Sequence, residues 1–149
     1  MPSIRSATVA DYPQILSVWR RSVEATHHFL SSNDIAAIEL DVARYLPLMS
    51  DLRVAHTDNE VLGFVAIEGD TVEMLFVDSK YFGQGIGSKL LAAVAGDRTC
   101  LRVDVNEQNP TGRTFYRARG FTQIGRSETD GEGRPFPILH LERRSPDPQ

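Results

Sequence analysis

A glycine-rich turn between an apolar strand and a helix constrains this chain more than any other feature. The stretch from Leu75 to Ser88 reads LFVDSKYFGQGIGS, in which apolar residues are followed by three closely spaced glycines. The first turn of a helix carries backbone N–H groups without acceptors and the positive end of the helix macrodipole. Glycines let an anion approach such a backbone closely. The pattern therefore predicts a phosphate-binding turn at the start of a helix.

Other glycine motifs fit this stretch less well. A dinucleotide fingerprint needs the order G-x-G-x-x-G, and here the third glycine, Gly87, comes one residue early. A Walker loop needs a glycine, a four-residue spacer and then Gly-Lys-Ser/Thr. Here Gly87 is followed by Ser88 and Lys89, so this motif is absent. A turn without any ligand remains an alternative from the spacing alone.

Hydrophobic periodicity and turn residues predict the rest of the fold. Helices are expected after a capping box of Thr8 and Asp11, after a cap at Ser32 or Asn33, at Gly85 and at Asn109. Strands that are first paired locally and then separated by helices favour an α/β fold of the α+β type, with a mixed, mostly antiparallel sheet flanked by about four helices. The expected strands are 4–7, 52–56, 62–68, 71–77, 101–105, 121–126 and 136–141.

Length and composition set the class of protein. The chain has 149 residues and a net charge of -4, which predicts one domain over residues 1–144 and disfavours a nonspecific grip on nucleic acid. The tail 145–149 is polar and rich in proline, so we expect it to be disordered. No apolar run is long enough to cross a membrane. The single cysteine, Cys100, is expected to fill apolar space, and a cytoplasmic location is expected.

The glycine turn resembles the GNAT superfamily of acyl-CoA-dependent N-acyltransferases. That family carries Arg/Gln-x-x-Gly-x-Gly/Ala after its fourth strand, and Gly85 and Gly87 match the two small positions. Val77 and Asp78 match the usual end of the strand, whereas Phe82 stands where the family has Arg or Gln.

The resemblance extends over most of the chain. It continues through VNEQN at 105–109, Phe115-Tyr116 and Gly120-Phe121, and it implies a GNAT fold. The segment RSVEATH at 21–27, taken with 105–109, is similar to a small bacterial branch, the YjaB-like acetyltransferases.

The resemblance implies acetyl-CoA as cosubstrate. In the family, the turn embraces the pyrophosphate mainly through main-chain N–H groups, and a backbone N–H near Phe76 or Val77 meets the carbonyl oxygen of the thioester. Asn106 and Asn109 fall in the segment that the family uses for pantetheine and CoA. The expected cofactor-binding residues are Phe76, Val77, Phe82, Gly83, Gln84, Gly85, Ile86, Gly87, Ser88, Asn106, Asn109 and Tyr116.

Two residues are expected to move protons. The resemblance implies that Tyr116 gives a proton to the departing CoA thiolate, since a phenol stays protonated at neutral pH. Glu73 lies on the expected fourth strand just before the turn and is a candidate base acting through water. The alternatives are a structural aromatic at Tyr116 and a polar residue on an exposed strand face at Glu73.

Further polar residues are candidates for the acceptor site. His27 and His28, at the end of the first helix, and Asp104, on the fifth strand, are expected to bind substrate. These three residues and Glu24 are also alternative bases. Four scattered histidines and one cysteine give no ligand spacing, so no metal is expected.

The function expected from these residues is direct acetyl transfer from acetyl-CoA to an amine of a small molecule, peptide or protein, by a monomer or homodimer. Two alternatives within the fold are a noncatalytic acyl-CoA sensor and a toxin that acetylates aminoacyl-tRNA; a nucleotide-binding domain is a third. The identity of the acceptor amine has no recognisable motif in the sequence.

Overall fold

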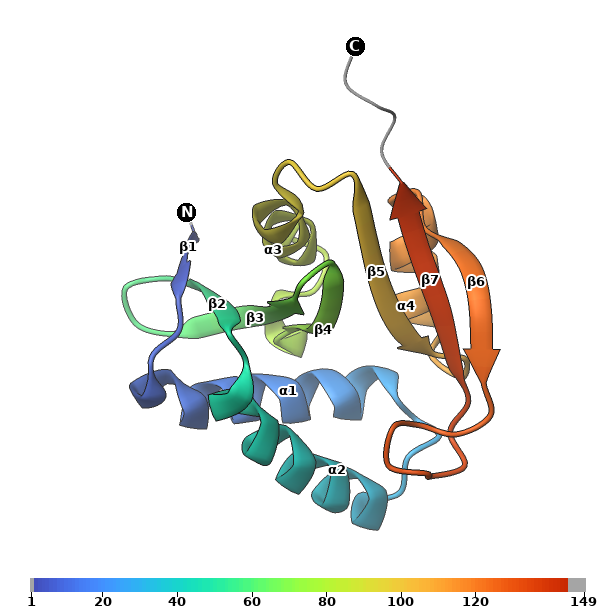
Figure 1. The fold of residues 1–149 in the computed structure, drawn as a ribbon. Helices are drawn as coiled ribbons and strands as arrows, with labels where there is room; N and C mark the ends of the chain where they lie inside the picture. The colour runs from blue at the N-terminus through green and yellow to red at the C-terminus, as the bar shows by residue number, and fades with distance from the viewer. Residues whose placement is uncertain (1, 145–149) are drawn as a thin grey trace. The chain divides into compact units, whose positions relative to one another are not determined.

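The structure is a computed structural model, and it describes residues 2–144. These residues form one mixed seven-stranded sheet and four α-helices. The predicted disordered tail 145–149 lies outside them. The strand order is β1-β2-β3-β4-β5-β7-β6 (Figure 1). The strands are β1 (Ser3–Ser6), β2 (Asp51–His56), β3 (Val61–Glu68), β4 (Thr71–Val77), β5 (Cys100–Asn106), β6 (Thr122–Ser127) and β7 (Ile138–Arg144). The helices are α1 (Tyr12–Thr26), α2 (Ser32–Tyr45), α3 (Ile86–Ala95) and α4 (Pro110–Ala118).

Strand pairing follows the predicted fold class. β4 pairs in parallel with β5 through Thr71 and Val72, while β1–β2, β2–β3, β5–β7 and β6–β7 are antiparallel. The mixed, mostly antiparallel sheet with four helices confirms the predicted α+β architecture. The chain divides into two compact units, residues 2–68 with 73–96 and residues 69–72 with 97–144.

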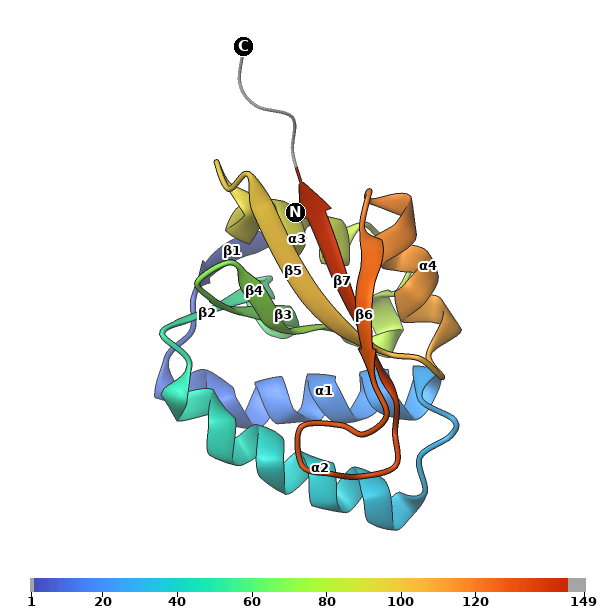
Figure 2. The ribbon, with the colours of Figure 1, turned by 45° about the vertical axis from the view of Figure 1, so that its right-hand side comes forward.

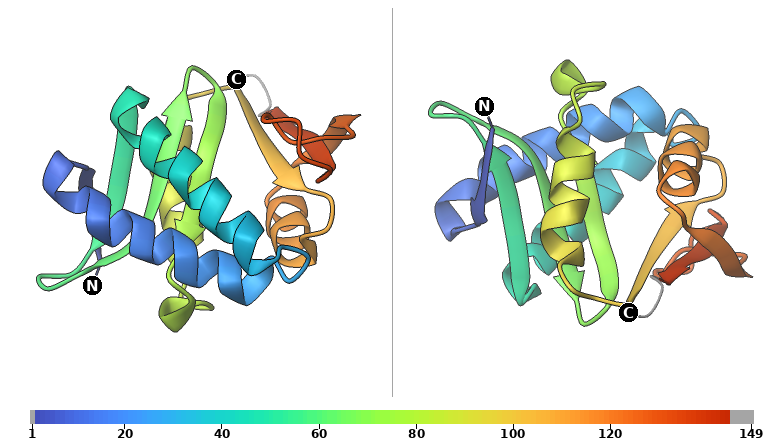
Figure 3. Two further views of the ribbon diagram at one scale, coloured as in Figure 1. Left: turned by 90° about the horizontal axis from the view of Figure 1, so that it is seen from below. Right: turned by 90° about the horizontal axis from the view of Figure 1, so that it is seen from above.

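The first unit has helices on both faces of its strands. Figure 3 shows α1 and α2 over one face of β2 and β3, and α3 over the other. The apolar residues of α1 and α2 form the core on their side together with Leu52, Val54 and Phe64 of the strands. On the α3 side, Gly63 leaves no room for a side chain, because an added Cβ would lie 2.9 Å from the Phe76 carbonyl oxygen and 3.1 Å from Leu90 Cδ1. This close contact fixes α3, and with it the start of the helix, against β3.

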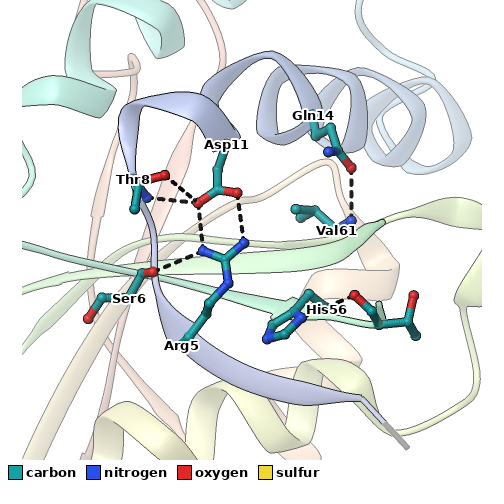
Figure 4. A network of polar contacts seen from close by, with 8 residues as sticks. Arg5, Ser6, Thr8, Asp11, Gln14, His56 and Val61 are labelled. Atoms are coloured by element: carbon teal, nitrogen blue, oxygen red, sulfur yellow. Dashed lines mark hydrogen bonds and ion pairs between the residues drawn. The ribbon is translucent and has the colours of Figure 1, made fainter. Parts of the chain in front are cut away.

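A buried carboxylate ties β1 to the start of α1. Asp11 accepts two hydrogen bonds from the Arg5 guanidinium, at 2.7 and 2.9 Å, and one from the Thr8 backbone N–H at 2.7 Å (Figure 4). The predicted capping box of Thr8 and Asp11 is present, and it caps a short 3₁₀ turn, Val9–Asp11, directly before α1. The bonds from Arg5 hold the pKa of Asp11 at about 2, although burial opposes this shift.

We expect Asp11→Asn to lower the free energy of unfolding by about 1–2 kcal/mol at pH 7. A carboxyl whose pKa drops on folding from about 3.9 stabilises by up to about 2.5 kcal/mol, and exposure of Arg5 to solvent reduces this. The stabilisation is complete above about pH 4 and is lost as pH falls through about 2. Urea denaturation of both proteins between pH 7 and pH 2 checks this.

The control is Asp58→Asn, which removes a carboxylate from the exposed β2–β3 turn. It should leave unfolding nearly unchanged over the same pH range. A difference between Asp11→Asn and the wild type that stayed constant down to pH 2 would contradict an ionic origin.

The second unit packs one helix on one face of three strands. Figure 2 shows β5, β7 and β6 side by side, and in Figure 1 α4 lies behind β5 and β7. Leu101, Val103 and Val105 alternate with exposed or half-buried residues along β5 and face α4. The side chains between them lie on the face of the sheet opposite to α4.

Several boundaries differ from the sequence prediction by one or more residues, and those of α2 and β7 are examples. Ser31, rather than Ser32 or Asn33, caps α2, and its Oγ accepts from the Asp34 N–H at 3.1 Å. β7 runs from Ile138 to Arg144 instead of covering 136–141. Just before it, the Pro137 carbonyl accepts from the N–H of Glu107, which lies in the loop between β5 and α4.

Candidate active site

The turn before α3 is exposed and has an open backbone. Gly83 and Gly85 have φ values of +79° and +80°, and no atom lies within 4 Å of a Cβ built on either. Gly85 caps α3, and its carbonyl accepts from the Lys89 N–H at 3.1 Å. In any α-helix the first N–H groups have no preceding carbonyl of the same helix to bond. The space around Gly83 and Gly85 leaves the backbone of the turn accessible, as an anion site requires.

The other residues of this turn contribute differently. The Phe82 side chain is exposed, as are Gly83 and Gln84. Ile86 is buried beneath the helix, and Gly87 and Ser88 are half-buried in the first turn. An exposed Phe82 supplies apolar surface where the family has a cationic or amide side chain.

A buried ion pair anchors the turn to α1. Asp78, fully buried at the end of β4, accepts from Arg21 Nε at 2.9 Å and from Arg21 Nη2 at 2.6 Å. Its other oxygen accepts from the Lys80 N–H at 3.1 Å. Burial alone would raise the pKa of Asp78, but these bonds keep it below its usual value. Asp78 therefore stays ionised and holds the start of the turn in place.

A second contact holds the turn from the other side. The Tyr81 hydroxyl donates to Glu60 in the β2–β3 turn, and Lys80 Nζ lies 3.6 Å from the same carboxylate. Sequence reasoning did not identify Arg21, Asp78 or Glu60 as residues that position the turn. The charge pattern contains no local signal, because each pair joins distant parts of the chain.

Alternate residues of β4 face opposite ways. Phe76 points into the core, with its ring centroid 5.6 Å from that of Phe64 and 6.5 Å from that of Trp19. Phe76 is half-buried, and its predicted action through the backbone N–H stays a prediction. Glu73 is exposed on the strand, and Val77 is half-buried.

Tyr116 lies in an aromatic cluster of the second unit. Its ring packs edge-on against Phe115, at 5.1 Å between centroids, and against Phe121, at 5.3 Å. The Arg119 guanidinium lies 3.7 Å from the Phe115 centroid. Burial raises the pKa of Tyr116, with a small opposing effect of Arg119, so the phenol stays protonated at any working pH. The aromatic cluster therefore holds the protonated Tyr116 side chain in a fixed position.

Asn109 has a structural role that the sequence predicted. It caps α4, and its Oδ1 accepts from the Gly112 N–H at 3.1 Å. Gly112 is required beneath this amide, since an added Cβ would lie 2.6 Å from Asn109 Nδ2. Asn106 ends β5, and its carbonyl accepts from the Asn109 N–H. Both asparagines thus shape the segment predicted to contact CoA.

Asp104 is paired with a histidine that sequence reasoning missed. Asp104 Oδ1 lies 2.7 Å from His140 Nδ1, and His140 Nε2 lies 2.7 Å from Ser127 Oγ. The three side chains come from β5, β7 and β6. The register between the strands brings these side chains together. The alternation of residues within a single strand could not predict this contact.

The two histidines at the end of α1 differ in environment. His27 is buried, with Nδ1 2.7 Å from Thr26 Oγ1 and its ring against Phe29. Burial, assisted by His28, lowers the pKa of His27 to about 4, so the ring is neutral at pH 7. His28 is exposed, and the nearby Glu24 lies 3.9 Å from Arg20. His27 presents little surface to an acceptor, while His28 is accessible.

The described residues contain neither a cluster of metal-ligand side chains nor a helix that could span a membrane. Among residues 2–144, no group of three or more His, Cys, Asp or Glu side chains is arranged to hold a metal ion. No helix in this part of the chain is long and apolar enough to cross a membrane. Cys100 is a half-buried free thiol at the start of β5.

An open helix start after the fourth strand of a mixed sheet is what the resemblance to the GNAT superfamily implies, and comparison with known proteins shows the family directly. Residues 49–123, about half of the chain, match a family described as "Acetyltransferase (GNAT) domain". The chain belongs to the GNAT family of N-acetyltransferases. The predicted fold and the predicted enzyme class, transfer of acetyl to an amine, are confirmed.

Relatives over nearly the whole length are similar in sequence and fold. Peptidyl-lysine N-acetyltransferase YjaB of Salmonella typhimurium is 40% identical over 95% of this chain and 97% of its own. YjaB of Escherichia coli K12 is 34% identical over 93% of this chain and 95% of its own. The solution structure of apo YjaB from Escherichia coli superposes with a TM-score of 0.88 at 35% identity, covering 95% of this chain and 97% of that one. The predicted resemblance to YjaB-like enzymes is confirmed.

Proposed function

We propose that the protein transfers the acetyl group of acetyl-CoA to the ε-amine of lysine in a peptide or protein. The observation that carries the proposal is the turn before α3, whose two positive-φ glycines leave the backbone open at a helix start. The acceptor is inferred from the two YjaB relatives, both named peptidyl-lysine N-acetyltransferases. A sensor without turnover and a toxin acting on aminoacyl-tRNA are not favoured, because neither relative has such a name.

The proposed CoA contacts follow the chemistry of each part of the ligand. Backbone N–H groups of the turn bind the pyrophosphate, and Phe82 provides apolar contact beside it. Asn106 and Asn109 lie along the segment assigned to pantetheine. A backbone N–H at Phe76 or Val77 stabilises the carbonyl oxygen as it gains charge. Gly83, Gln84, Gly85, Ile86, Gly87 and Ser88 make up the remainder of the proposed contact set.

The reaction is a direct attack of the amine on the thioester. Only the neutral amine is a nucleophile, and at pH 7 neutralising a lysine of pKa about 10.4 costs roughly 4.6 kcal/mol. A base that accepts this proton therefore accelerates transfer, and Glu73 and Asp104 are the carboxylates proposed for it. Tyr116 donates a proton to the CoA thiolate as the tetrahedral intermediate collapses. No covalent enzyme intermediate is required, because holding the amine beside the thioester and stabilising the developing charge lower most of the activation barrier.

Acetylation of a defined peptide tests the proposal. The wild type is incubated with acetyl-CoA and a peptide whose N-terminus is blocked and which contains one lysine. We expect mass spectrometry to find one acetyl group on the lysine side chain and thiol assays to find an equal amount of CoA. A matched peptide with arginine at that position should stay unmodified.

Two outcomes would contradict the lysine assignment. One is acetylation only of peptides with a free N-terminus, which would indicate an α-amine acceptor. The other is transfer only to small amines in a competition between both kinds of acceptor. A cytoplasmic location and a monomeric or homodimeric state remain predictions, which fractionation and sedimentation check.

A further inference from the structure

The ring of His27 is held in a fixed orientation where α1 passes into the loop before α2. The His27 backbone N–H donates to the Val23 carbonyl at 2.8 Å, as in the helix itself. The ring lies against Phe29, with 5.4 Å between centroids, and its Nδ1 is 2.7 Å from Thr26 Oγ1. Only 7% of the residue is exposed. Its neighbours therefore restrict the ring to one position.

Hydrogen bonding decides which ring nitrogen of His27 carries the proton. The Thr26 hydroxyl has one hydrogen, which it donates to the Ser22 carbonyl at 2.8 Å. Thr26 Oγ1 can therefore only accept from His27, so Nδ1 is the protonated nitrogen. Burial, assisted by His28, lowers the pKa of His27 to about 4, and the ring is neutral at pH 7. Nε2 therefore has a free lone pair.

This lone pair of His27 has no partner among residues 2–144. Only Nδ1 of the ring makes a hydrogen bond in this part of the chain. Every buried side-chain nitrogen or oxygen atom of the described residues has a partner, so Nε2 is not sealed in the core. The small exposed part of the ring must include it. A ring that is nine-tenths buried thus presents one unused acceptor atom to a bound molecule.

α1 crosses the strands of the first unit from β1 toward β4. Early in the helix, Gln14 Oε1 accepts from the Val61 N–H of β3 at 2.9 Å. Later, the Trp19 ring meets Phe76 of β4, with 6.5 Å between centroids. Because the strand order is β1-β2-β3-β4, the last turn of α1 extends toward the edge of β4 that faces away from β3 (Figure 3).

His27 therefore lies near the end of β4. Arg21 forms a neutral pair with Asp78, the first residue after β4, with 2.9 Å between Nε and Oδ2. His27 follows Arg21 by six residues, which is roughly 9 Å along a helix axis. Val23, one turn before His27, packs in the same apolar cluster as Phe76. The end of β4 is also where the resemblance places the thioester carbonyl, and all these residues belong to the first unit.

The charges around the loop between α1 and α2 favour a cation. Arg20 lies 3.9 Å from Glu24 and 3.2 Å from Glu39, so two carboxylates share one guanidinium. The Asp34 carboxylate accepts from the Ser31 N–H at 3.0 Å and has no cation partner within residues 2–144. The three carboxylates and one guanidinium sum to a charge of -2. The carbonyl end of α1 adds a partial negative charge.

Apolar side chains border the same loop. Phe29 and Leu30 are both half-buried, and Phe29 touches the ring of His27. A lysine side chain combines an apolar stem with N–H donors and a positive charge at its tip. The apolar border, the lone pair and the surrounding negative charge each match one part of it.

We propose that His27 Nε2 accepts a hydrogen bond from the ε-nitrogen of the acceptor lysine and holds it at the end of β4. This inference rests on the proposed function and deepens it by naming a substrate-binding residue of the first unit. The ammonium and the neutral amine both carry N–H groups, so the bond persists after the proton leaves. The proton goes to a separate base, because so weakly basic a ring does not take it from an ammonium.

The experiment replaces His27 by residues that keep different parts of the ring. Gln places an amide near the Nε2 position, Asn places an N–H near Nδ1, and Phe keeps the ring without either nitrogen. We expect His27→Asn and His27→Phe to raise KM for the single-lysine peptide about 10- to 100-fold, the range for one hydrogen bond to a charged group. The turnover number kcat and KM for acetyl-CoA should change little, and His27→Gln should show the smallest rise.

A purely structural role for His27 predicts a different order of effects. Asn would keep the bond to Thr26 and Phe the packing against Phe29, so His27→Gln would be the most damaging in peptide KM and in thermal melting. That order, or an unchanged peptide KM in all three variants, would overturn the proposal. The matched control is His56→Phe, at a half-buried histidine of β2 that bonds the Thr57 carbonyl, and it should keep the wild-type KM.

A binding measurement on the wild type keeps the test independent of turnover and of how well the variants fold. Calorimetry in the presence of CoA compares the lysine peptide with a matched peptide containing norleucine, whose stem carries no ammonium. We expect lysine to bind at least about 10-fold more tightly, and nitrogen NMR to show the Nδ1–H tautomer of His27 with Nε2 shifted by the lysine peptide alone.

The same measurements distinguish failure of this proposal from failure of the proposed function. Equal affinity for the two peptides, or an unshifted Nε2, would overturn the role of His27 even in a protein that acetylates lysine. A protein that shows the preference and the shift but leaves the lysine unmodified would contradict only the proposed function.

Discussion

Gly85→Asp is expected to weaken CoA binding about 5- to 1000-fold. The new carboxylate would stand at the cap of α3, where the pyrophosphate is proposed to bind. Two unit charges about 4 Å apart repel by roughly 1 kcal/mol in water and about 4 kcal/mol near a protein surface. Each 1.4 kcal/mol is tenfold in affinity. Titration calorimetry with CoA measures the change.

Backbone strain is separated from charge by two controls. Gly85→Ala has the same unfavourable φ of +80° with open space around its Cβ, but no charge. Gly69→Asp places the same carboxylate at another open glycine, with φ +58°, between β3 and β4. We expect the first to bind CoA only modestly less tightly and the second to bind it normally. Wild-type affinity in Gly85→Asp would refute the anion site.

Tyr116→Phe is expected to lower kcat about 10- to 1000-fold, with the fold and the affinity for CoA retained. A positioned proton donor contributes about this much. The ring packing against Phe115 and Phe121 does not depend on the hydroxyl, so the aromatic cluster should persist. Because burial raises the pKa of Tyr116, the phenol is protonated throughout, and the loss should be constant between about pH 6 and pH 9.

Single-turnover kinetics must show that chemistry is the slow step in this comparison. The control is Tyr45→Phe, which removes the hydroxyl of a half-buried tyrosine at the end of α2. It should keep wild-type turnover. Unchanged turnover in Tyr116→Phe under the same conditions would remove Tyr116 from the mechanism.

Features encoded within a few residues could be read from the sequence. The apolar strand, the glycine turn and α3 are contiguous, so their pattern indicated both structure and ligand type. Asn109 followed by Pro110 predicted the start of α4, which the structure places at Pro110. At α2, three consecutive polar residues could each cap the helix, and hydrogen bonding selected Ser31. The local sequence therefore limits which residues can be the N-cap of α2, but it does not select one of them.

Features that depend on strand register or distant contacts could not be predicted. Asp104 was singled out, but His140 lies 36 residues away and meets it only through the pairing of β5 with β7. The bulge between Gln123 and Gly125 shifts the β6 register and brings Ser127 to the ring. A one-residue slip of either strand would point these groups to the opposite face.

The Arg21–Asp78 ion pair has a consequence for how the anion site forms during folding. The two residues are 57 positions apart, so the turn is held only after α1 has docked. Contacts of such long sequence separation form late and at a high entropic cost of loop closure. A peptide of β4, the turn and α3 alone would contain every glycine of the motif and lack its anchor. We therefore expect the proposed affinity for a phosphate to require the assembled first unit and not the motif alone.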